Sequence, residues 1–297
     1  MKLFVLVLLI SAFSSLSLAK VVQDFAKSDC SEYFIKTPKG EVITPTVFTE
    51  NNYKQICQHF GKRYRYATLY DTNNRISVYS AYTFIGDITT VRNEEWKNEP
   101  QLENSSYNED MTEITVAEMD KYSHQAVNRD YAESQKNTIP PIEYTRGHLF
   151  PNQFAADQFQ ADSTFAFTNV APQTQHSNGE WAKQVETPMR REILRECRPS
   201  NNNPTYVVTG VVPGNSWISI KRKEKVIDKG VNIPTYYWTA FCCLHNDVRI
   251  SKGFLSLQNQ PDGRTYELSE MSVNILNGRL SKLYNKIFKV FGDLCLN

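Results

Sequence analysis

Residues 144–186 gather the polar side chains of this chain that could best do chemistry together. His148 stands near the start of the stretch, Asn169 follows, and Asn178 and Glu186 come at its end. A neutral imidazole can take a proton from water near neutral pH, and a carboxamide oxygen is a suitable ligand for Mg²⁺. Hydrolysis of a phosphodiester needs an activated water, stabilised charge at phosphorus and a neutralised leaving oxygen. This set of groups suits that reaction.

The spacing suggests a division of roles among these residues. His148 can act as the general base, and Gly147 before it has no side chain, so a substrate backbone can come close. Arg146 adds a fixed positive charge, or else serves as a buried structural partner. Asn178 can be the one protein ligand of a Mg²⁺ ion that keeps most of its waters. Glu186 lies eight residues later, about two turns of a helix, and can hold a metal-bound water or orient Asn178.

Every member of the set also has an ordinary structural alternative. A histidine after a glycine is more often a turn or core residue. Asn169, expected at the end of a strand, can hydrogen-bond near His148 or a substrate phosphate, but can also simply cap the strand. Asn178 followed by glycine is a turn signal, and Glu186 alone would be a solvated helix charge. The order and spacing of the set therefore carry the prediction.

The whole chain sets limits on partners. Its 297 residues suffice for one large domain or two small ones. The formal net charge is only +1, whereas a protein that holds nucleic acid through phosphate contacts alone is usually more basic. A nucleic-acid surface must therefore be a local patch.

The first residues predict a secretory signal peptide over residues 1–19. Lys2 supplies a positive charge, residues 3–10 are an unbroken apolar run, and Ser17-Leu18-Ala19 is a small-x-small cleavage site. The alternative is an uncleaved anchor, but the run is too short to span a bilayer. No later stretch is apolar enough to cross a membrane. We expect a secreted protein whose residues 20–297 form a single domain.

The six cysteines fit an extracellular compartment and predict three disulfides. Cys30 with Cys57 is the expected local pair. Cys242 and Cys243 would point to opposite faces of a strand and need different partners; the rest of the connectivity stays open. A zinc site built from Cys242, Cys243 and His245 is the rival interpretation. Asn104-Ser105-Ser106 is a glycosylation sequon in a polar stretch.

Hydrophobic patterning predicts strands and helices without regular alternation, so an α+β fold is expected. A helix over 181–196 has an apolar stripe at every fourth residue, with Pro188 as a predicted kink or interruption. Strands are predicted at 64–69 and 76–84, joined as a hairpin through Asp71-Thr72-Asn73-Asn74, and at 164–170, 206–212 and 236–243. We expect helical residues over 113–132 and over 268–291, with an interruption of the second segment at Asn277-Gly278. The other expected segments are irregular structure over 28–60, a surface loop over 94–110, an extended segment at 142–150, and a loop or short helix over 152–162.

The motifs of this stretch resemble those of the DNA/RNA non-specific endonuclease family. They are Thr145-Arg146-Gly147-His148, Thr168-Asn169-Val170-Ala171-Pro172-Gln173, Asn178 and Glu186. Over nearly all the chain after residue 19, the sequence is similar to the endonuclease domain-containing 1 branch of secreted animal proteins. The features of that branch are Ala67-Thr68-Leu69-Tyr70-Asp71, Ser80-Ala81-Tyr82, Gln125-Ala126 with Asp130-Tyr131, and Ile233-Pro234 ahead of Trp238.

The resemblance implies a ββα-metal fold with a mainly antiparallel central sheet flanked by helices. It implies one Mg²⁺ or Mn²⁺ ion and cleavage of DNA and RNA with little sequence preference, leaving a 5′-phosphate. The family's general base falls on His148, its metal-binding asparagine on Asn178, the glutamate supporting the water shell of the metal on Glu186, and its second asparagine on Asn169. The arginine that contacts the scissile phosphate matches Arg92, ahead of Trp96-Lys97-Asn98-Glu99-Pro100.

One position departs from the family pattern. The family has an aspartate where this chain has Thr145, so a carboxylate that would support the motif is missing. The base and the metal ligand both remain, which favours an active enzyme. The alternative is a catalytically weak or inactive secreted protein that binds nucleic acid or protein on the same fold.

Overall fold

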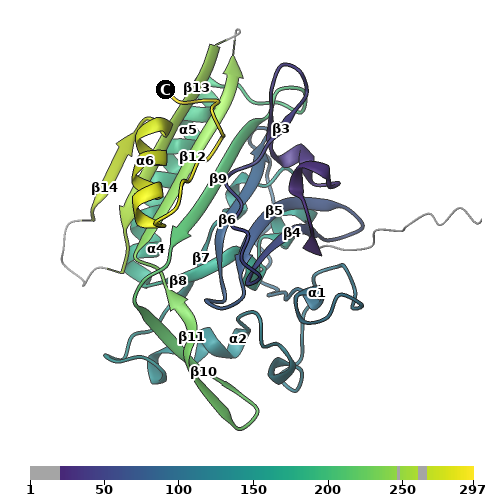
Figure 1. The fold of residues 1–297 in the computed structure, drawn as a ribbon, viewed down its shortest axis with the longest axis vertical. Coiled ribbons are helices and arrows are strands. Elements are labelled where there is room, and N and C mark those ends of the chain that lie inside the picture. Colours follow the sequence, from purple (N-terminus) through teal and green to yellow (C-terminus); the bar gives the residue numbers. More distant parts are fainter. Residues whose placement is uncertain (1–20, 246–247, 260–265) are drawn as a thin grey trace, which may run out of the picture.

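A large antiparallel sheet organises the computed structural model, which describes residues 21–245, 248–259 and 266–297 (Figure 1). Within these residues the sheet has eight strands in the order β1-β4-β5-β6-β9-β12-β13-β14, each antiparallel to its neighbours. The strands are β1 (Val21–Val22), β4 (Tyr53–His59), β5 (Tyr64–Asp71), β6 (Ile76–Phe84), β9 (Thr205–Val212), β12 (Tyr236–His245), β13 (Val248–Leu257) and β14 (Leu268–Met271). The predicted α+β class with a mainly antiparallel central sheet is confirmed.

Shorter strand pairs and helices surround this sheet. The pairs are β2 (Ile35–Lys36) with β3 (Val42–Ile43), β7 (Thr145–His148) with β8 (Val170–Gln173), and β10 (Ser216–Arg222) with β11 (Lys225–Ile233). The α-helices are α1 (Pro100–Glu103), α2 (Asn128–Ala132), α3 (Gln158–Ser163), α4 (Gln175–Trp181), α5 (Thr187–Glu196) and α6 (Val273–Leu283). A π-helical turn, Ala182–Glu186, joins α4 to α5. Short 3₁₀ turns lie at Phe25–Lys27, Ser31–Tyr33, Met119–Lys121, Ser134–Lys136, Asn152–Phe154 and Phe167–Asn169.

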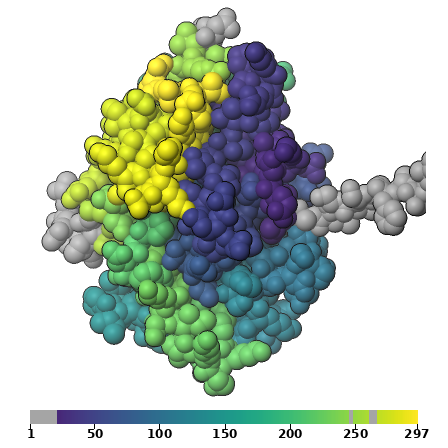
Figure 2. Space-filling model, in the orientation of Figure 1, coloured from purple at the N-terminus to yellow at the C-terminus, as the bar shows by residue number. Residues whose placement is uncertain are grey.

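Alternation along the strands gives the sheet two apolar faces, each packed against different helices. On β9, Val207 and Val211 face the core that contains the helix residues Trp181 and Ile193. Their neighbours Val208 and Val212 face a second core, which includes α6 and the N-terminal segment. Figure 1 accordingly shows α6 on the near side of β12 and β13 and α5 on the far side. In Figure 2 the C-terminal segment, in yellow, borders N-terminal residues drawn in dark blue on the face toward the viewer.

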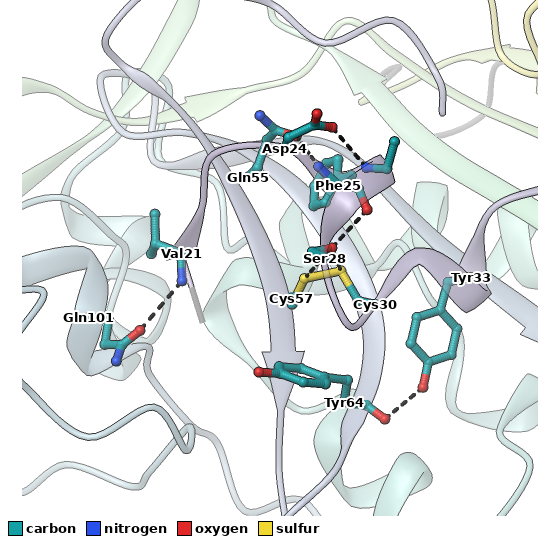
Figure 3. Close-up of a disulfide and its surroundings, with 11 residues drawn as sticks. Val21, Asp24, Phe25, Ser28, Cys30, Tyr33, Gln55, Cys57, Tyr64 and Gln101 are labelled. Atoms are coloured by element: carbon teal, nitrogen blue, oxygen red, sulfur yellow. Dashed lines mark hydrogen bonds between the residues drawn. A yellow bond between two sulfur atoms is a disulfide. The ribbon is translucent and has the colours of Figure 1, made fainter. Parts of the chain in front are cut away.

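Three disulfides tie distant segments to the large sheet. The predicted pair Cys30–Cys57 joins the N-terminal segment to β4, beside hydrogen bonds of Ser28 and Tyr33 (Figure 3). The adjacent cysteines of β12 take different partners, as expected, in Cys197–Cys243 and Cys242–Cys295. The zinc interpretation is wrong, because both of its cysteines are bonded to sulfur. The predicted signal peptide lies outside the described residues, and none of the helices in those residues is long and apolar enough to cross a membrane.

Three predicted elements differ in the structure. Only a 3₁₀ turn and α2 form within 113–132, because side chains bind the backbone there: Glu118 accepts the N–H of Thr115, and Glu103 accepts those of two further residues. The expected strand over 164–170 is a 3₁₀ turn before β8, where the N–H of Phe167 bonds to Lys97 O. The segment 268–291 begins as β14, and the side chain of Ser272 then caps α6.

Other boundaries also moved. The Asn277-Gly278 dipeptide does not interrupt α6, and a seven-residue strand, β4, lies inside the segment expected to be irregular. The short helix α1 lies in the expected loop 94–110, and β10, β11 and β13 were not predicted. The hairpin of β5 and β6 is confirmed, with Asp71 accepting the N–H groups of Asn73 and Asn74 in its turn.

Candidate active site

Two antiparallel strands followed by a helix form the base of the site. β7 pairs with β8 so that His148 lies opposite Val170 and Thr145 opposite Gln173. The chain then enters α4 through Thr174, whose side chain accepts the N–H of Ser177. This β7-β8-α4 unit packs against the large sheet through Tyr237 of β12, whose hydroxyl donates toward two backbone carbonyls of the strand pair.

A cavity of about 350 Å³ brings most of the predicted residues together. It is lined by Arg92, Arg146, His148, Pro151, Asn152, Gln153, Asn178, Ala182 and Glu186. Five of the six predicted site residues are therefore in one place, although they come from three separate segments: the loop of Arg92, strand β7, and the helix of Asn178 and Glu186. Asn152 and Gln153 were missed, because a polar residue in a short turn carries no sequence signal of its own.

His148 sits in an apolar setting that keeps it neutral. Its ring centroid lies 5.5 Å from that of Trp96 and 5.0 Å from that of Phe165. Burial, and after it the positive charge of Arg92, lower the pKa of His148 to about 4. The buried Nε2 atom has no hydrogen-bond partner among the described residues. At neutral pH the imidazole is thus uncharged, which is the form that can accept a proton.

The two arginines are held over aromatic rings. The guanidinium carbon of Arg146 lies 4.9 Å from the ring centroid of Trp96 and also faces Tyr131 and Phe167. That of Arg92 lies 5.0 Å above the ring of Phe165, which also borders His148. One aromatic group, composed of Trp96, Tyr131, Phe165 and Phe167, therefore holds both cations and the imidazole.

Each arginine also has a polar partner. Arg146 donates a hydrogen bond to the side chain of Asn128, and burial lowers its pKa. The Nε of Arg92 lies 2.7 Å from a carboxylate oxygen of Glu94, in a pair that is largely exposed to solvent. Because the second pair is exposed, a phosphate can displace the carboxylate at little cost.

The amide of Asn178 is oriented by Thr145. Its Nδ2 donates to Thr145 Oγ1 at 3.1 Å, and that hydroxyl donates in turn to the carbonyl of Gln173 at 2.9 Å. No protein group in the described part of the chain donates to the amide oxygen of Asn178. That oxygen is thus available to a cation at the wall of the cavity, and a carboxamide oxygen suits Mg²⁺ or Mn²⁺.

Glu186 is the buried carboxyl group of the site. It is 9% exposed, and the amide of Gln153 donates to it at 3.1 Å. Burial raises its pKa to about 7, against the lowering effect of the hydrogen bond from Gln153. The described residues contain no cluster of three or more His, Cys, Asp or Glu side chains suited to a metal. The donor set therefore fits a cation that keeps most of its waters, with Asn178 as its protein ligand and Glu186 nearby.

Two residues lie elsewhere than expected. Asn169 precedes β8 and is fully buried; its side chain bonds the N–H and carbonyl of Phe150 and the hydroxyl of Ser80. It stands behind His148 and does not line the cavity. Gly147 does not give room to a substrate, because a Cβ there would meet Gln173 Oε1 at 2.0 Å and Tyr237 OH at 2.7 Å. Its missing side chain instead lets the strand pair pack on β12.

A strand pair, a following helix, a neutral histidine and an oriented asparagine on one cavity define a ββα-type site. A sequence model described as "DNA/RNA non-specific endonuclease" matches residues 44–279, and the chain belongs to this family.

Similar proteins are known from mammals. The chain is 31% identical over 220 residues to the "Endonuclease domain-containing 1 protein" of Homo sapiens and 30% identical over 220 residues to that of Mus musculus. The matches cover 72% of this chain but only 39% and 38% of those proteins. A solved EndoG/EndoGI complex matches 77% of this chain and 84% of its own chain with a TM-score of 0.49 and 17% identity, a likeness too low to add to the family match.

Proposed function

We propose that this protein is a secreted, Mg²⁺- or Mn²⁺-dependent endonuclease that hydrolyses phosphodiester bonds of DNA and RNA with little sequence preference. The observation that carries the proposal is the meeting of His148, Asn178 and Glu186 with two arginines on one cavity. Membership of the DNA/RNA non-specific endonuclease family supports the same substrate class.

In this proposal His148 accepts a proton from the attacking water. The water oxygen forms a bond to phosphorus, the bond from phosphorus to the 3′-oxygen breaks, and the leaving oxygen takes a proton from solvent. Products are a 3′-hydroxyl and a 5′-phosphate. When bound at Asn178, the cation would supply Lewis-acid stabilisation of charge at the phosphate and the leaving oxygen.

The remaining residues bind and orient. Arg92 and Arg146 place two positive charges at the cavity, which suits a phosphate with developing negative charge. Glu186 orients groups on the cation side, and Asn169 holds the backbone next to His148 in place. The charges of the two arginines give the cavity a local positive patch, although the net charge of the whole chain is only +1. Contacts to phosphate do not depend on the base, which fits low sequence preference.

Secretion is supported by two independent features. The apolar run and cleavage site within residues 1–19 are typical of a signal peptide. The three disulfides among the described residues are typical of proteins from oxidising compartments.

The proposal is tested with purified protein on plasmid DNA and on RNA, with Mg²⁺ and with EDTA. We expect cleavage of both substrates that EDTA abolishes. His148→Ala should lower the rate by about 10²–10⁴-fold, as for loss of a general base, with the fold retained. His124→Ala removes an exposed histidine outside the cavity and should leave the rate unchanged.

The competing function is nucleic-acid or protein binding without turnover, which the absence of the family aspartate at Thr145 favours. Binding of DNA that is indifferent to EDTA, with no cleavage by the wild type beside an active control nuclease, would establish that alternative.

A further inference from the structure

The helix that carries Asn178 and Glu186 contains one turn wider than the rest. It runs through α4, the π-helical turn Ala182–Glu186 and α5 without a break. Within the wide turn the N–H of Thr187 bonds to the carbonyl of Ala182, five residues earlier. π turns of this kind are rare and are often found at functional sites.

The wide turn places the two site residues on one face of the helix. A regular α-helix turns about 100° per residue, so residues eight apart would point about 80° away from each other. A π turn takes up one extra residue, which reduces this difference to roughly 20°. Asn178, Ala182 and Glu186, each four residues after the last, accordingly all line the same cavity.

The same turn keeps the buried side of the helix in line. Trp181, Val185, Met189 and Ile193 also follow at intervals of four, and each is at most 1% exposed. In a regular α-helix the first and last of them would differ by about 120° in direction. With the extra residue taken up, the difference falls to roughly 20°. The helix residues that line the cavity and those that pack in the core thus both depend on the wide turn.

Pro188 gives a physical cause for this irregularity. Proline has no N–H to donate, and in an α-helix its ring would collide with the carbonyl four residues earlier. That carbonyl belongs to Gln184, inside the wide turn. A wider turn moves it away from the ring. Pro188 is itself exposed, so it is not needed to fill the core.

We propose that Pro188 is a positioning residue, which imposes the wide turn and thereby brings Glu186 onto the cavity face of Asn178. The functional part of this inference rests on the proposed function, since it assumes that Asn178 and Glu186 act at one cation site. Its structural part, that Pro188 maintains the wide turn, does not depend on activity.

The test is Pro188→Ala, alone and combined with deletion of Lys183, an exposed residue of the wide turn. The single variant gains an N–H that can bond to Gln184, so the turn can tighten and rotate Glu186 away. We expect cleavage and Mn²⁺ affinity, measured by titration without substrate, to fall by about 10- to 100-fold, as for loss of outer-shell support of a metal site. Thermal stability should fall as well, because a tightened turn also rotates Trp181 and Val185 relative to Met189 and Ile193 in the core.

The deletion should rescue the variant. Asn178 and Glu186 are then seven residues apart in a regular helix, about 700° of turn, which again places them roughly 20° apart. Gly278→Ala is the matched control: it improves a helix on the other face of the sheet, and its new Cβ meets no atom within 4 Å. It should raise stability without changing cleavage or Mn²⁺ affinity.

A Pro188→Ala structure that keeps the hydrogen bond from Thr187 N to Ala182 O would overturn the inference. If the wild type binds Mn²⁺, an equal Mn²⁺ affinity of the Pro188→Ala variant would overturn it too. The structural readout needs no turnover. If the wild type fails to cut DNA, the proposed function is wrong. The structure of the Pro188→Ala variant still shows whether Pro188 maintains the wide turn.

Discussion

The hydroxyl of Thr145 joins Asn178 to the β7-β8 pair, accepting from its amide at 3.1 Å and donating to the carbonyl of Gln173 at 2.9 Å. A threonine here thus supplies an acceptor, the same hydrogen-bonding role that a carboxylate could play toward the amide. What it lacks is the negative charge. The departure from the family pattern therefore leaves the orientation of Asn178 intact.

The first prediction concerns this contact. Thr145→Val keeps the shape but removes the acceptor, so the amide of Asn178 can rotate and present its nitrogen to the cation. We expect Mn²⁺ affinity and cleavage to fall by about 10- to 100-fold. Thr145→Ser retains the hydroxyl and is the control that should stay close to the wild type.

Thr145→Asp completes the series, because it adds the charge of the family residue beside the cation site. We expect tighter Mn²⁺ binding than in the wild type. Equal Mn²⁺ affinity of the valine, serine and wild-type proteins would show that Thr145 does not orient Asn178.

The sequence predicted the grouping of the candidate residues better than it predicted the elements around them. His148, Asn178 and Glu186 could be proposed as one set because they lie within one stretch of the chain and their types suit one reaction. Pro188 indicated an irregular helix, but only the structure shows that the irregularity is a wide turn that aligns two rows of side chains. Hydrophobic periodicity indicates where a helix is regular, but it does not give the change in side-chain direction across an irregular turn.

Long-range contacts were beyond sequence reasoning. Trp96, Tyr131 and the pair Phe165 and Phe167 come from three segments, and nothing in their spacing predicts that they surround Arg146 and His148. The burial of Asn169 likewise follows from its bonds to Ser80 of another strand. Such contacts depend on how the elements pack, which patterning along the chain does not specify.

The second prediction concerns the access of phosphate to Arg92. In this structure Glu94 pairs with Arg92 at 2.7 Å, and the hydrogen bond lowers the pKa of Glu94, so the carboxylate stays charged. A substrate phosphate must take its place. Glu94→Gln should weaken the pair and lower KM by up to about fivefold at low salt, since exposed pairs contribute about 0–1 kcal/mol, with kcat little changed.

Glu95→Gln is the matched control for this change. It removes the same charge from the neighbouring exposed position, which has no recorded pair with Arg92. Comparing KM for the two variants over a range of salt separates release of Arg92 from a general gain in positive charge. A similar KM decrease in both would assign the effect to net charge alone.

The last prediction follows from the pKa of Glu186, raised from its usual 4.5 to about 7 by burial. A carboxyl group that holds its proton more tightly in the folded state contributes stability below pH 4.5, and this contribution is lost as pH rises through about 7. Without metal, Glu186→Gln should therefore be more stable than the wild type at pH 8 and similar to it below pH 4.5.

The measurement is thermal unfolding in EDTA across this pH range, with Glu133→Gln as a control that removes an exposed carboxylate. The stabilised variant should also cleave poorly, because a neutral amide cannot supply the charge that the cation side of the cavity needs. A stability difference that does not change with pH would mean that the pKa of Glu186 is the same in the folded and the unfolded protein, and would contradict the prediction.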